Sequence, residues 1–401
     1  MRRAAEWAAL GTIIVLSAWL WRTPGSPDVG IWSTWIESAQ RLGPRAGYAA
    51  SVHDYPPGST TLLWVAASLG ERFGLDSLSV LKALVSVFLT AATALVLAWT
   101  RRPLLAAFTH AALAVGAVGL VYLDVLAAPL LLGAIWAASG GRTRLALGLF
   151  FAACAIKWQP VIVAPFVIAY ACSIRARGTT VARSLAGVLA AAVLATGLLV
   201  AVFGFHVLES FYRATGHKQL SANALNVGWI ATWLLHLVDP ARWGPLVDGR
   251  VGIIVPHHSV LVPIFKLTAG VTYLWVLRRY VRTGDRSVAA MLRHATVGYL
   301  AYFALNAGVH ENHLLMPVVL AIALTALEPR WLWAAIVIAA GANANLVAFY
   351  GIDGLDSGIH RLAGVDVTVW MAMANVAALV ATASRLIDGS AATLPAKGTP
   401  T

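Results

Sequence analysis

The stretch Leu78–Trp99, "LSVLKALVSVFLTAATALVLAW", decides the fold class of this chain, because its 22 residues are apolar almost throughout. An α-helix needs about 20 such residues to cross the hydrocarbon core of a bilayer. Two arginines and a proline follow in "TRRP" (Thr100–Pro103), and a second apolar run begins directly after them. The stretch therefore predicts a membrane-spanning helix that ends in a short basic loop.

The same pattern continues along the 401-residue chain, which is 59% hydrophobic and only 11% charged. Soluble proteins carry roughly a quarter charged residues. The apolar segments lie near residues 4–21, 78–99, 104–121, 125–139, 145–156, 159–174, 184–205, 259–277, 288–307, 314–327, 331–350 and 365–383. They predict an all-α polytopic membrane protein with about 12 transmembrane helices. Segments shorter than about 20 residues are expected to be tilted, extended by flanking residues, or only partly spanning.

A single transmembrane domain is predicted over residues 1–385, followed by a polar tail, 386–401, that is rich in small residues and expected to be disordered. The first residues have the basic and apolar parts of a signal peptide, but the many apolar segments behind them favour a retained first helix. One further segment, "NALNVGWIATWLLHLV" (Asn223–Val238), is short and begins with asparagine. It predicts an external or re-entrant helix.

The placement of charge predicts the orientation. With the N-terminus inside, the cytoplasmic stretches hold 17 of the 29 lysines and arginines but only 4 of the 17 acidic residues. Basic residues in short loops mark the cytoplasmic side. Both termini are therefore predicted to be cytoplasmic, and the long stretches 22–77 and 206–258 external. Loop arginines also account for the net charge of +12, so the lipid bilayer is an expected partner and nucleic acid is not.

The two cysteines, Cys154 and Cys172, both lie inside apolar runs. This placement argues against a disulfide framework or a cysteine metal site and predicts buried thiols.

The first external stretch opens with "SPDVGIWSTW", in which Asp28 follows Pro27, and Trp32 and Trp35 recur at helical spacing. The spacing predicts an amphipathic helix at the membrane surface, with its tryptophans at the level of the headgroups. Asp28 can cap this helix or serve as a functional carboxylate.

The stretch "VHDYPPGST" (Val52–Thr60) follows, and a second interfacial helix is expected after it. Its two prolines fix the backbone and remove two N–H donors. They predict either a rigid loop that holds Asp54 and Tyr55 toward a substrate, or a plain turn leading into the helix.

Polar residues also interrupt the apolar segments. Asp124, Lys157 and Gln159 fall at predicted external ends of spans. An ionisable residue near membrane depth is a functional candidate, although a lysine can also extend its ammonium to the interface. Lys157 and Gln159 together suit a lipid phosphate, as a point charge beside a hydrogen-bond donor.

Two later clusters face the same predicted compartment. His217, Lys218, Asn223 and Asn226 precede the asparagine-led helix, where an asparagine can cap the helix or bind sugar hydroxyls. His257 and His258 are weak evidence for a metal, because no third ligand follows at the usual spacing.

The late stretch "VHENH" contains His310, Glu311 and His313. Its histidines are one residue too close for the zinc-protease motif, but residues three apart on a helix share a face and can point into one cavity. No cofactor is expected, and a divalent metal is left open.

Four motifs in order resemble the multi-span glycosyltransferases of the GT-C class, nearest the branch of the dolichyl-phosphate-glucose-dependent glucosyltransferases and their bacterial relatives. They are the aspartate with its aromatic helix (Asp28–Trp35), "DYPP" (Asp54–Pro57), "LSANALNVGW" (Leu220–Trp229) and "VHE" (Val309–Glu311). The resemblance spans roughly residues 25 to 315. Val227 and Gly228 displace one aromatic residue of the third motif, and Asn312 replaces the lysine that often follows the fourth.

The resemblance implies transfer of a hexose or pentose from a polyprenyl-phosphate donor to an acceptor hydroxyl of a glycolipid, a lipid-linked oligosaccharide or an envelope polysaccharide, usually with inversion. It implies that Asp28 is the general base, that Asp54 supports it or binds substrate, and that Lys157 and His310 contact the donor phosphate. High Ala, Arg and Trp usage suggests a bacterial plasma membrane, with the site on its external face.

Two other functions compete with this reading. A transporter or flippase of lipid-linked sugars would place ionisable residues near the bilayer midplane, whereas here they gather in external stretches. A non-enzymatic membrane scaffold leaves that clustering unexplained.

Overall fold

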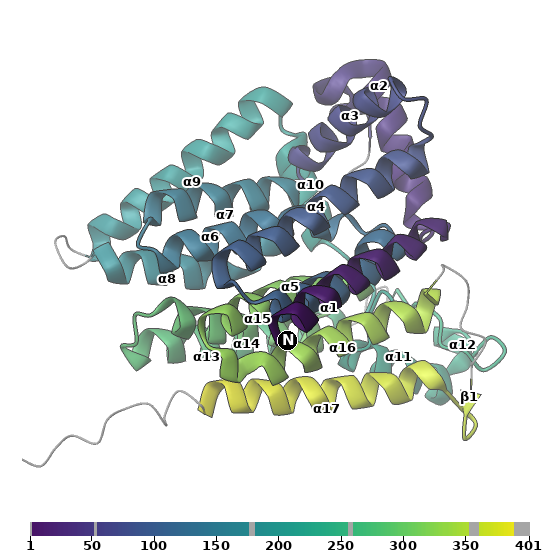
Figure 1. Cartoon of the computed structure of the whole chain (residues 1–401). Helices are drawn as coiled ribbons and strands as arrows, with labels where there is room; N and C mark the ends of the chain where they lie inside the picture. Colours follow the sequence, from purple (N-terminus) through teal and green to yellow (C-terminus); the bar gives the residue numbers. More distant parts are fainter. Residues whose placement is uncertain (1, 52–53, 176–180, 256–259, 353–360, 389–401) are drawn as a thin grey trace, which may run out of the picture.

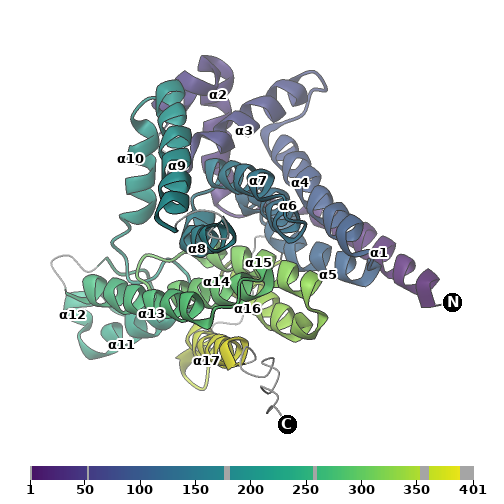
Figure 2. The same cartoon turned by 90° about the vertical axis from the view of Figure 1, so that its left-hand side faces the viewer.

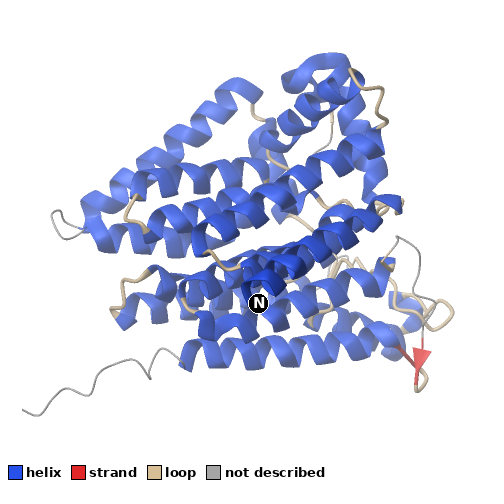
Figure 3. Ribbon diagram, in the orientation of Figure 1, coloured by secondary structure: helices blue, strands red, loops and turns tan. Residues whose placement is uncertain are grey.

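The computed structural model describes residues 2–51, 54–175, 181–255, 260–352 and 361–388, and within them the chain is almost entirely helical (Figure 3). The only strands in these residues are β1 (Arg361–Leu362) and β2 (Val365–Asp366), which form a two-stranded antiparallel hairpin. The helices are α1 (Arg2–Ala18), α2 (Asp28–Ala50), α3 (Pro57–Glu71), α4 (Ser77–Thr100), α5 (Pro103–Ala114), α6 (Ala128–Ser139), α7 (Thr143–Ile156), α8 (Ala164–Arg175), α9 (Val181–Phe203), α10 (His206–Thr215), α11 (Val227–Val238), α12 (Pro240–Trp243), α13 (Leu261–Thr283), α14 (Val288–Leu305), α15 (Leu315–Leu327), α16 (Leu332–Tyr350) and α17 (Val367–Asp388).

Each of the twelve apolar segments coincides with one of these helices. Seven stretches are long and apolar enough to cross a membrane: Arg3–Arg22, Ser77–Thr100, Leu185–Phe203, Leu261–Thr283, Val288–Leu305, Pro329–Tyr350 and Val367–Asp388. The fold is therefore compatible with an all-α polytopic membrane protein, in which seven helices meet the length criterion for a span and twelve spans are not confirmed.

The remaining predicted segments form shorter apolar helices, Pro103–Gly119, Leu123–Ser139, Thr143–Ile156, Gln159–Ser173 and Glu311–Leu327. Several are pieced together from two kinds of helix. The 3-10 turns η3 (Leu123–Ala127), η4 (Gln159–Val163) and η5 (Glu311–Leu314) precede α6, α8 and α15, and the π-helical turn η2 (Val115–Gly119) follows α5. Non-α backbone is tolerated at membrane depth where protein surrounds it.

The segments predicted to be external gather at one end of the molecule. Figure 1 shows α2, α3, α11, α12 and β1 at the right-hand end of the bundle, whereas α9 begins and α13 and α17 finish at the opposite end. Both helices expected in the first external stretch are present, as α2 and α3. The asparagine-led segment forms α11, which has only 12 residues. It is too short to span a bilayer unaided.

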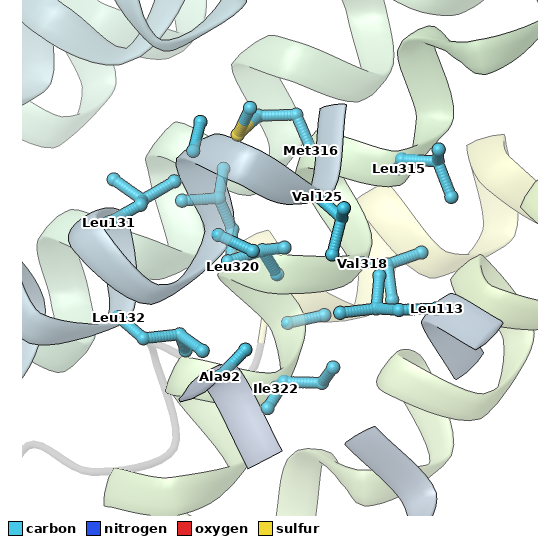
Figure 4. Packing of buried hydrophobic residues seen from close by; sticks show 14 of the residues in the cluster. Ala92, Leu113, Val125, Leu131, Leu132, Leu315, Met316, Val318, Leu320 and Ile322 are labelled. Carbon is cyan, nitrogen blue, oxygen red and sulfur yellow. The ribbon is translucent and has the colours of Figure 1, made fainter. Parts of the chain in front are cut away.

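The core is built around α14 and α15. Every residue of α15 from Leu315 to Thr325 is buried, and Figure 4 shows its leucine, valine and isoleucine side chains packed against residues of α4, α5, η3 and α6. Because lipid tails are as apolar as leucine, such a core is stabilised by close packing rather than by removal from water.

Other helices turn apolar side chains outward. On α9, Val193, Leu194 and Leu198 are 71%, 75% and 66% exposed, and Figure 2 places α9 and α10 together at one edge of the bundle. Exposed aliphatic side chains along a long helix are what a lipid-facing surface requires.

Two further sequence predictions can be compared with the structure. Cys154 and Cys172 are both buried, as predicted. The polar tail was predicted to begin at residue 386, and α17 continues three residues past this boundary, to Asp388. Residues 389–401 lie outside the described residues.

Candidate active site

A cavity of about 590 Å³ opens among the segments that were predicted to be external. It brings together side chains from α2, from the turn before α3, from η4, from the stretch after α10 and from η5. Ten of the thirteen predicted site residues line it: Asp28, Asp54, Tyr55, Lys157, Gln159, His217, Asn223, His310, Glu311 and His313. Residues nearly 300 positions apart in the sequence thus share one space.

Asp28 is the first residue of α2, not its cap. The N-cap position belongs to Pro27, and no side chain caps this helix. The capping interpretation of Asp28 was therefore wrong. Burial raises the pKa of Asp28, the carboxylates of Asp54 and Asp124 raise it further, and the ammonium of Lys157 acts in the opposite direction. A carboxylate of raised pKa is a better proton acceptor than an ordinary aspartate.

The segment before α2 is fixed by hydrogen bonds to its neighbours. The backbone N–H of Ser26 donates to the carbonyl of Leu120 at 3.0 Å, and the hydroxyl of Thr23 donates to the carbonyl of Gly119 at 2.5 Å. The end of η2, the turn that follows α5, therefore fixes the position at which α2 begins.

The turn at Asp54–Tyr55 is anchored through its backbone. The carbonyl of Tyr55 accepts hydrogen bonds from the Tyr48 hydroxyl at 3.1 Å and from the Ser210 hydroxyl at 3.0 Å. Pro57 is the first residue of α3, so the turn both leads into a helix and holds Tyr55 in place. Both interpretations of the double proline describe part of this arrangement.

Three aromatic rings form one wall of the cavity. The Tyr55 ring lies edge-on to Trp32 and Trp35, with centroids 5.2 and 5.4 Å away, and the two tryptophans are 4.7 Å apart. The Trp32 indole Nε1 is buried and has no hydrogen-bond partner among the described residues. A buried unpartnered donor beside a cavity is available to a ligand.

Lys157 is the C-cap residue that follows α7, and it is 2% exposed. Its Nζ contacts the Tyr55 hydroxyl and lies 3.1 Å from Asp124 Oδ2. The alternative that Lys157 extends its ammonium to the interface is wrong, because the side chain is enclosed. Gln159 follows at the start of η4.

The three histidines of the cavity lie close together. The rings of His217 and His310 are 4.7 Å apart, those of His310 and His313 are 5.5 Å apart, and Nε2 of His217 lies 3.9 Å from Asp54. Burial lowers the pKa of His310 to about 3, and the neighbouring His217 and Lys157 act in the same direction. His310 is therefore neutral at physiological pH, and its buried Nε2 has no partner within the described residues.

A hydrogen-bond network surrounds Glu311, another residue of the cavity lining. The hydroxyls of Tyr122 and Tyr350 donate to Glu311 Oε1 at 2.5 and 3.2 Å. The amide of Asn223 donates to the Tyr350 hydroxyl at 3.3 Å. Asn223 has a positive φ of 56°, a conformation that asparagine tolerates better than most residues.

Three predicted residues do not line the cavity. Asn226 is fully buried: it caps α11 through the N–H of Trp229, and its amide donates to the carbonyl of Phe303. Lys218 is exposed outside the cavity, and Asp124 lies behind Lys157. A direct substrate contact was thus the wrong expectation for Asn226, whose capping alternative is the one that the structure has.

Several cavity residues were missed in the sequence. Tyr302, Tyr350 and Asn312 line the cavity, and the Tyr302 hydroxyl lies 3.1 Å from Nδ1 of His313. Lys266 also reaches the cavity from α13, and its Nζ donates to the carbonyl of Thr215 at 3.1 Å. Each of these residues lies within or beside an apolar helix, where a lone polar residue gives no motif.

Within the part of the chain that the structure describes, no group of three or more His, Cys, Asp or Glu side chains has a geometry that could hold a metal ion. His257 and His258 lie outside the described residues.

No protein-family model matches the sequence, and no curated protein matches it either. The resemblance to the GT-C class therefore rests on the motifs alone.

Proposed function

We propose that this chain is an integral membrane glycosyltransferase of the GT-C type, which moves a sugar from a polyprenyl-phosphate donor to an acceptor hydroxyl on the non-cytoplasmic face. One observation carries the proposal: a carboxylate of raised pKa, Asp28, and a buried ammonium, Lys157, line the same cavity at one end of a membrane bundle.

The two groups match the two halves of such a reaction. The hydroxyl of the acceptor must lose a proton as it attacks the anomeric carbon, and Asp28 takes that proton as the general base. The bond from the anomeric carbon to the phosphate oxygen breaks, and the leaving lipid phosphate gains negative charge. Lys157 and the neutral N–H of His310 stabilise this charge, because preorganised donors are most effective where charge develops.

The remaining walls suit a sugar joined to a lipid. Trp32, Trp35 and Tyr55 present aromatic faces, and Glu311 and Asn223 offer groups that hydrogen-bond to hydroxyls. Ile31 and Ile253 line the same cavity and are 47% and 51% exposed. A polar cavity with an apolar margin matches an amphiphilic donor, whose headgroup must be wet while its chain stays in lipid.

The test uses the purified full chain in lipid vesicles, supplied with radiolabelled polyprenyl-phosphate sugars and a bacterial lipid extract as the source of acceptors. We expect a new labelled product with at least one donor. Asp28→Asn should lower kcat by about 10²- to 10⁴-fold, the usual contribution of a general base.

The matched control is Glu37→Gln, which removes an exposed carboxylate from the same helix without touching the cavity and should leave kcat unchanged. Sugar transfer by Asp28→Asn at the rate of the unaltered chain would show that Asp28 is not the general base. Movement of the labelled donor across the vesicle membrane without cleavage of its sugar–phosphate bond would replace the proposal by the transporter or flippase alternative.

A further inference from the structure

Lys157 and Asp124 form a buried ion pair that lies across the wall of the cavity. Their side chains are only 3% and 2% exposed, with Nζ 3.1 Å from Oδ2. Lys157 lines the cavity, whereas Asp124 does not. Asp124 instead borders a separate void of about 10 Å³ among Leu113, Met316 and other apolar residues. One partner therefore faces the substrate space, and the other is closed off from it.

The ammonium of Lys157 has three N–H groups. One contacts the Tyr55 hydroxyl and a second reaches Asp124. Among the described residues no further atom accepts a hydrogen bond from the third, and the ammonium also lies 3.6 Å from the centroid of the Tyr55 ring. Because Lys157 lines the cavity, the third N–H is the one that a ligand there can reach. Asp124 is itself held by Asn312, whose Nδ2 donates to the same Oδ2 at 3.0 Å.

This arrangement has an energetic reason. A buried ammonium without an anionic partner is strongly disfavoured, and removing one member of a buried pair leaves an uncompensated charge. The ionisable groups facing Lys157 from the surrounding elements are Asp28, Asp54, Tyr55, Asp124, His310, Glu311 and His313. Of the carboxylates among them, only Asp124 makes an ion pair with Lys157 within the described residues. Without Asp124, the ammonium of Lys157 would turn toward a carboxylate of the cavity. Asp28 is the candidate, because the charge of Lys157 already acts to lower the pKa of Asp28.

We propose that Asp124 is a positioning residue. It holds Lys157 with one N–H directed into the cavity toward the anionic group of the substrate, and it prevents this ammonium from pairing with Asp28. The assignment of that anion as a lipid phosphate rests on the proposed function.

The first test measures binding, which needs no sugar transfer. Farnesyl phosphate is titrated into the purified full chain in nanodiscs by calorimetry. Asp124→Asn should weaken binding by about 10- to 100-fold, which corresponds to the loss of one charge-assisted hydrogen bond. Asp285→Asn is the matched control: it removes the carboxylate of another ion pair, that with Arg293, at a residue that does not line the cavity, and should change binding by less than about 3-fold.

The second test asks whether Asp124 acts through Lys157. In a Lys157→Met background, Asp124→Asn should have no further effect on farnesyl phosphate binding, because residues that act as one unit are not additive. An equal loss in both backgrounds would overturn the proposal. If a thermal melt shows that Asp124→Asn does not fold, Asp124→Glu takes its place, because it keeps the negative charge. This variant should bind farnesyl phosphate within about 3-fold of the unaltered chain. Loss of binding in Asp124→Glu would also overturn the proposal.

The third readout is the pH profile of transfer. Asp124 raises the pKa of Asp28 and Lys157 lowers it. In Asp124→Asn, the acidic limb of kcat/KM should therefore move to lower pH, which a purely structural defect would not do. If the unaltered chain binds farnesyl phosphate but transfers no sugar, the proposed function fails while the binding cycle still decides the role of Asp124. If it does not bind farnesyl phosphate, both proposals fail.

Discussion

Lys82 offers the sharpest test of how the molecule places Asp28, the proposed general base. This residue of α4 is 1% exposed, and its ammonium contacts the segment that follows α1. Nζ donates to the carbonyls of Leu20, Trp21 and Thr23 at 2.8, 2.9 and 2.5 Å, and lies 3.0 Å from the Thr23 hydroxyl. The same segment continues into Asp28, so Lys82 ties the start of α2 to a long helix.

The cost of removing this ammonium can be worked out from its partners. In Lys82→Met, the carbonyl of Leu20 keeps the backbone N–H of Thr23 as a donor. The carbonyls of Trp21 and Thr23 have no other donor among the described residues, and a buried unsatisfied carbonyl costs about 1–3 kcal/mol. Trp21 is 43% exposed, which allows water to serve its carbonyl. Removing the buried charge of Lys82 offsets a further part of this cost. We therefore expect the free energy of unfolding to fall by about 2 kcal/mol.

The assay is thermal unfolding of the purified protein in detergent, with transfer measured on the same samples. Lys82→Met should lower Tm by several degrees and reduce kcat, because Asp28 loses its fixed position. Lys266→Met is the matched control, since that ammonium donates to one exposed carbonyl, that of Thr215, and its loss should cost less than about 0.5 kcal/mol. A Tm for Lys82→Met equal to or above that of the control would refute this reasoning.

Two further predictions follow from the site and its supporting helices. Asp54→Asn removes a negative charge that raises the pKa of Asp28; because a base acts above its pKa, the acidic limb of kcat/KM should move to lower pH, and a limb that stays in place or moves upward would contradict the assigned coupling. Gly58→Ala should lower the free energy of unfolding by about 1–3 kcal/mol, since its Cβ would lie 2.4 Å from the carbonyl oxygen of Ala155. In Gly30→Ala the added Cβ meets nothing within 4 Å, so this variant should be neutral or slightly stabilising in the same melts. Equal effects of the two substitutions would contradict the explanation that Gly58 is needed for the close approach of α3 to Ala155.

The helices themselves were largely predictable from the sequence. Apolar runs such as Leu78–Trp99 report directly on burial in lipid or protein, and each predicted segment became a helix. The number of spans was not predictable in the same way. A helix such as α15 is enclosed by protein on all sides, so it does not need the full thickness of the bilayer to be apolar.

The cavity was predictable only where polar residues stood together. Asp54 and Tyr55 were recognisable beside two prolines, and His310 and Glu311 beside each other. Tyr350 could not be recognised, because a single tyrosine at the end of an apolar helix is ordinary at a membrane interface. Asn226 was recognised in the sequence but was assigned the wrong role. Its position before a helix fitted both a sugar contact and a cap, and only the bonds to Trp229 and Phe303 separate the two.

The enclosed position of α14 also bears on how the chain is made. Its buried residues include Arg293 and His294. An arginine at the centre of a lone apolar helix opposes insertion from the translocon by about 2.5–3.5 kcal/mol, and Arg293, near the start of α14, carries part of that cost. Arg293 lies 3.3 Å from Asp285, which is only eight residues earlier, so its partner has already been synthesised when the arginine emerges. We therefore expect α13 and α14 to enter the membrane together as a hairpin, with the ion pair formed during synthesis rather than after the bundle has closed.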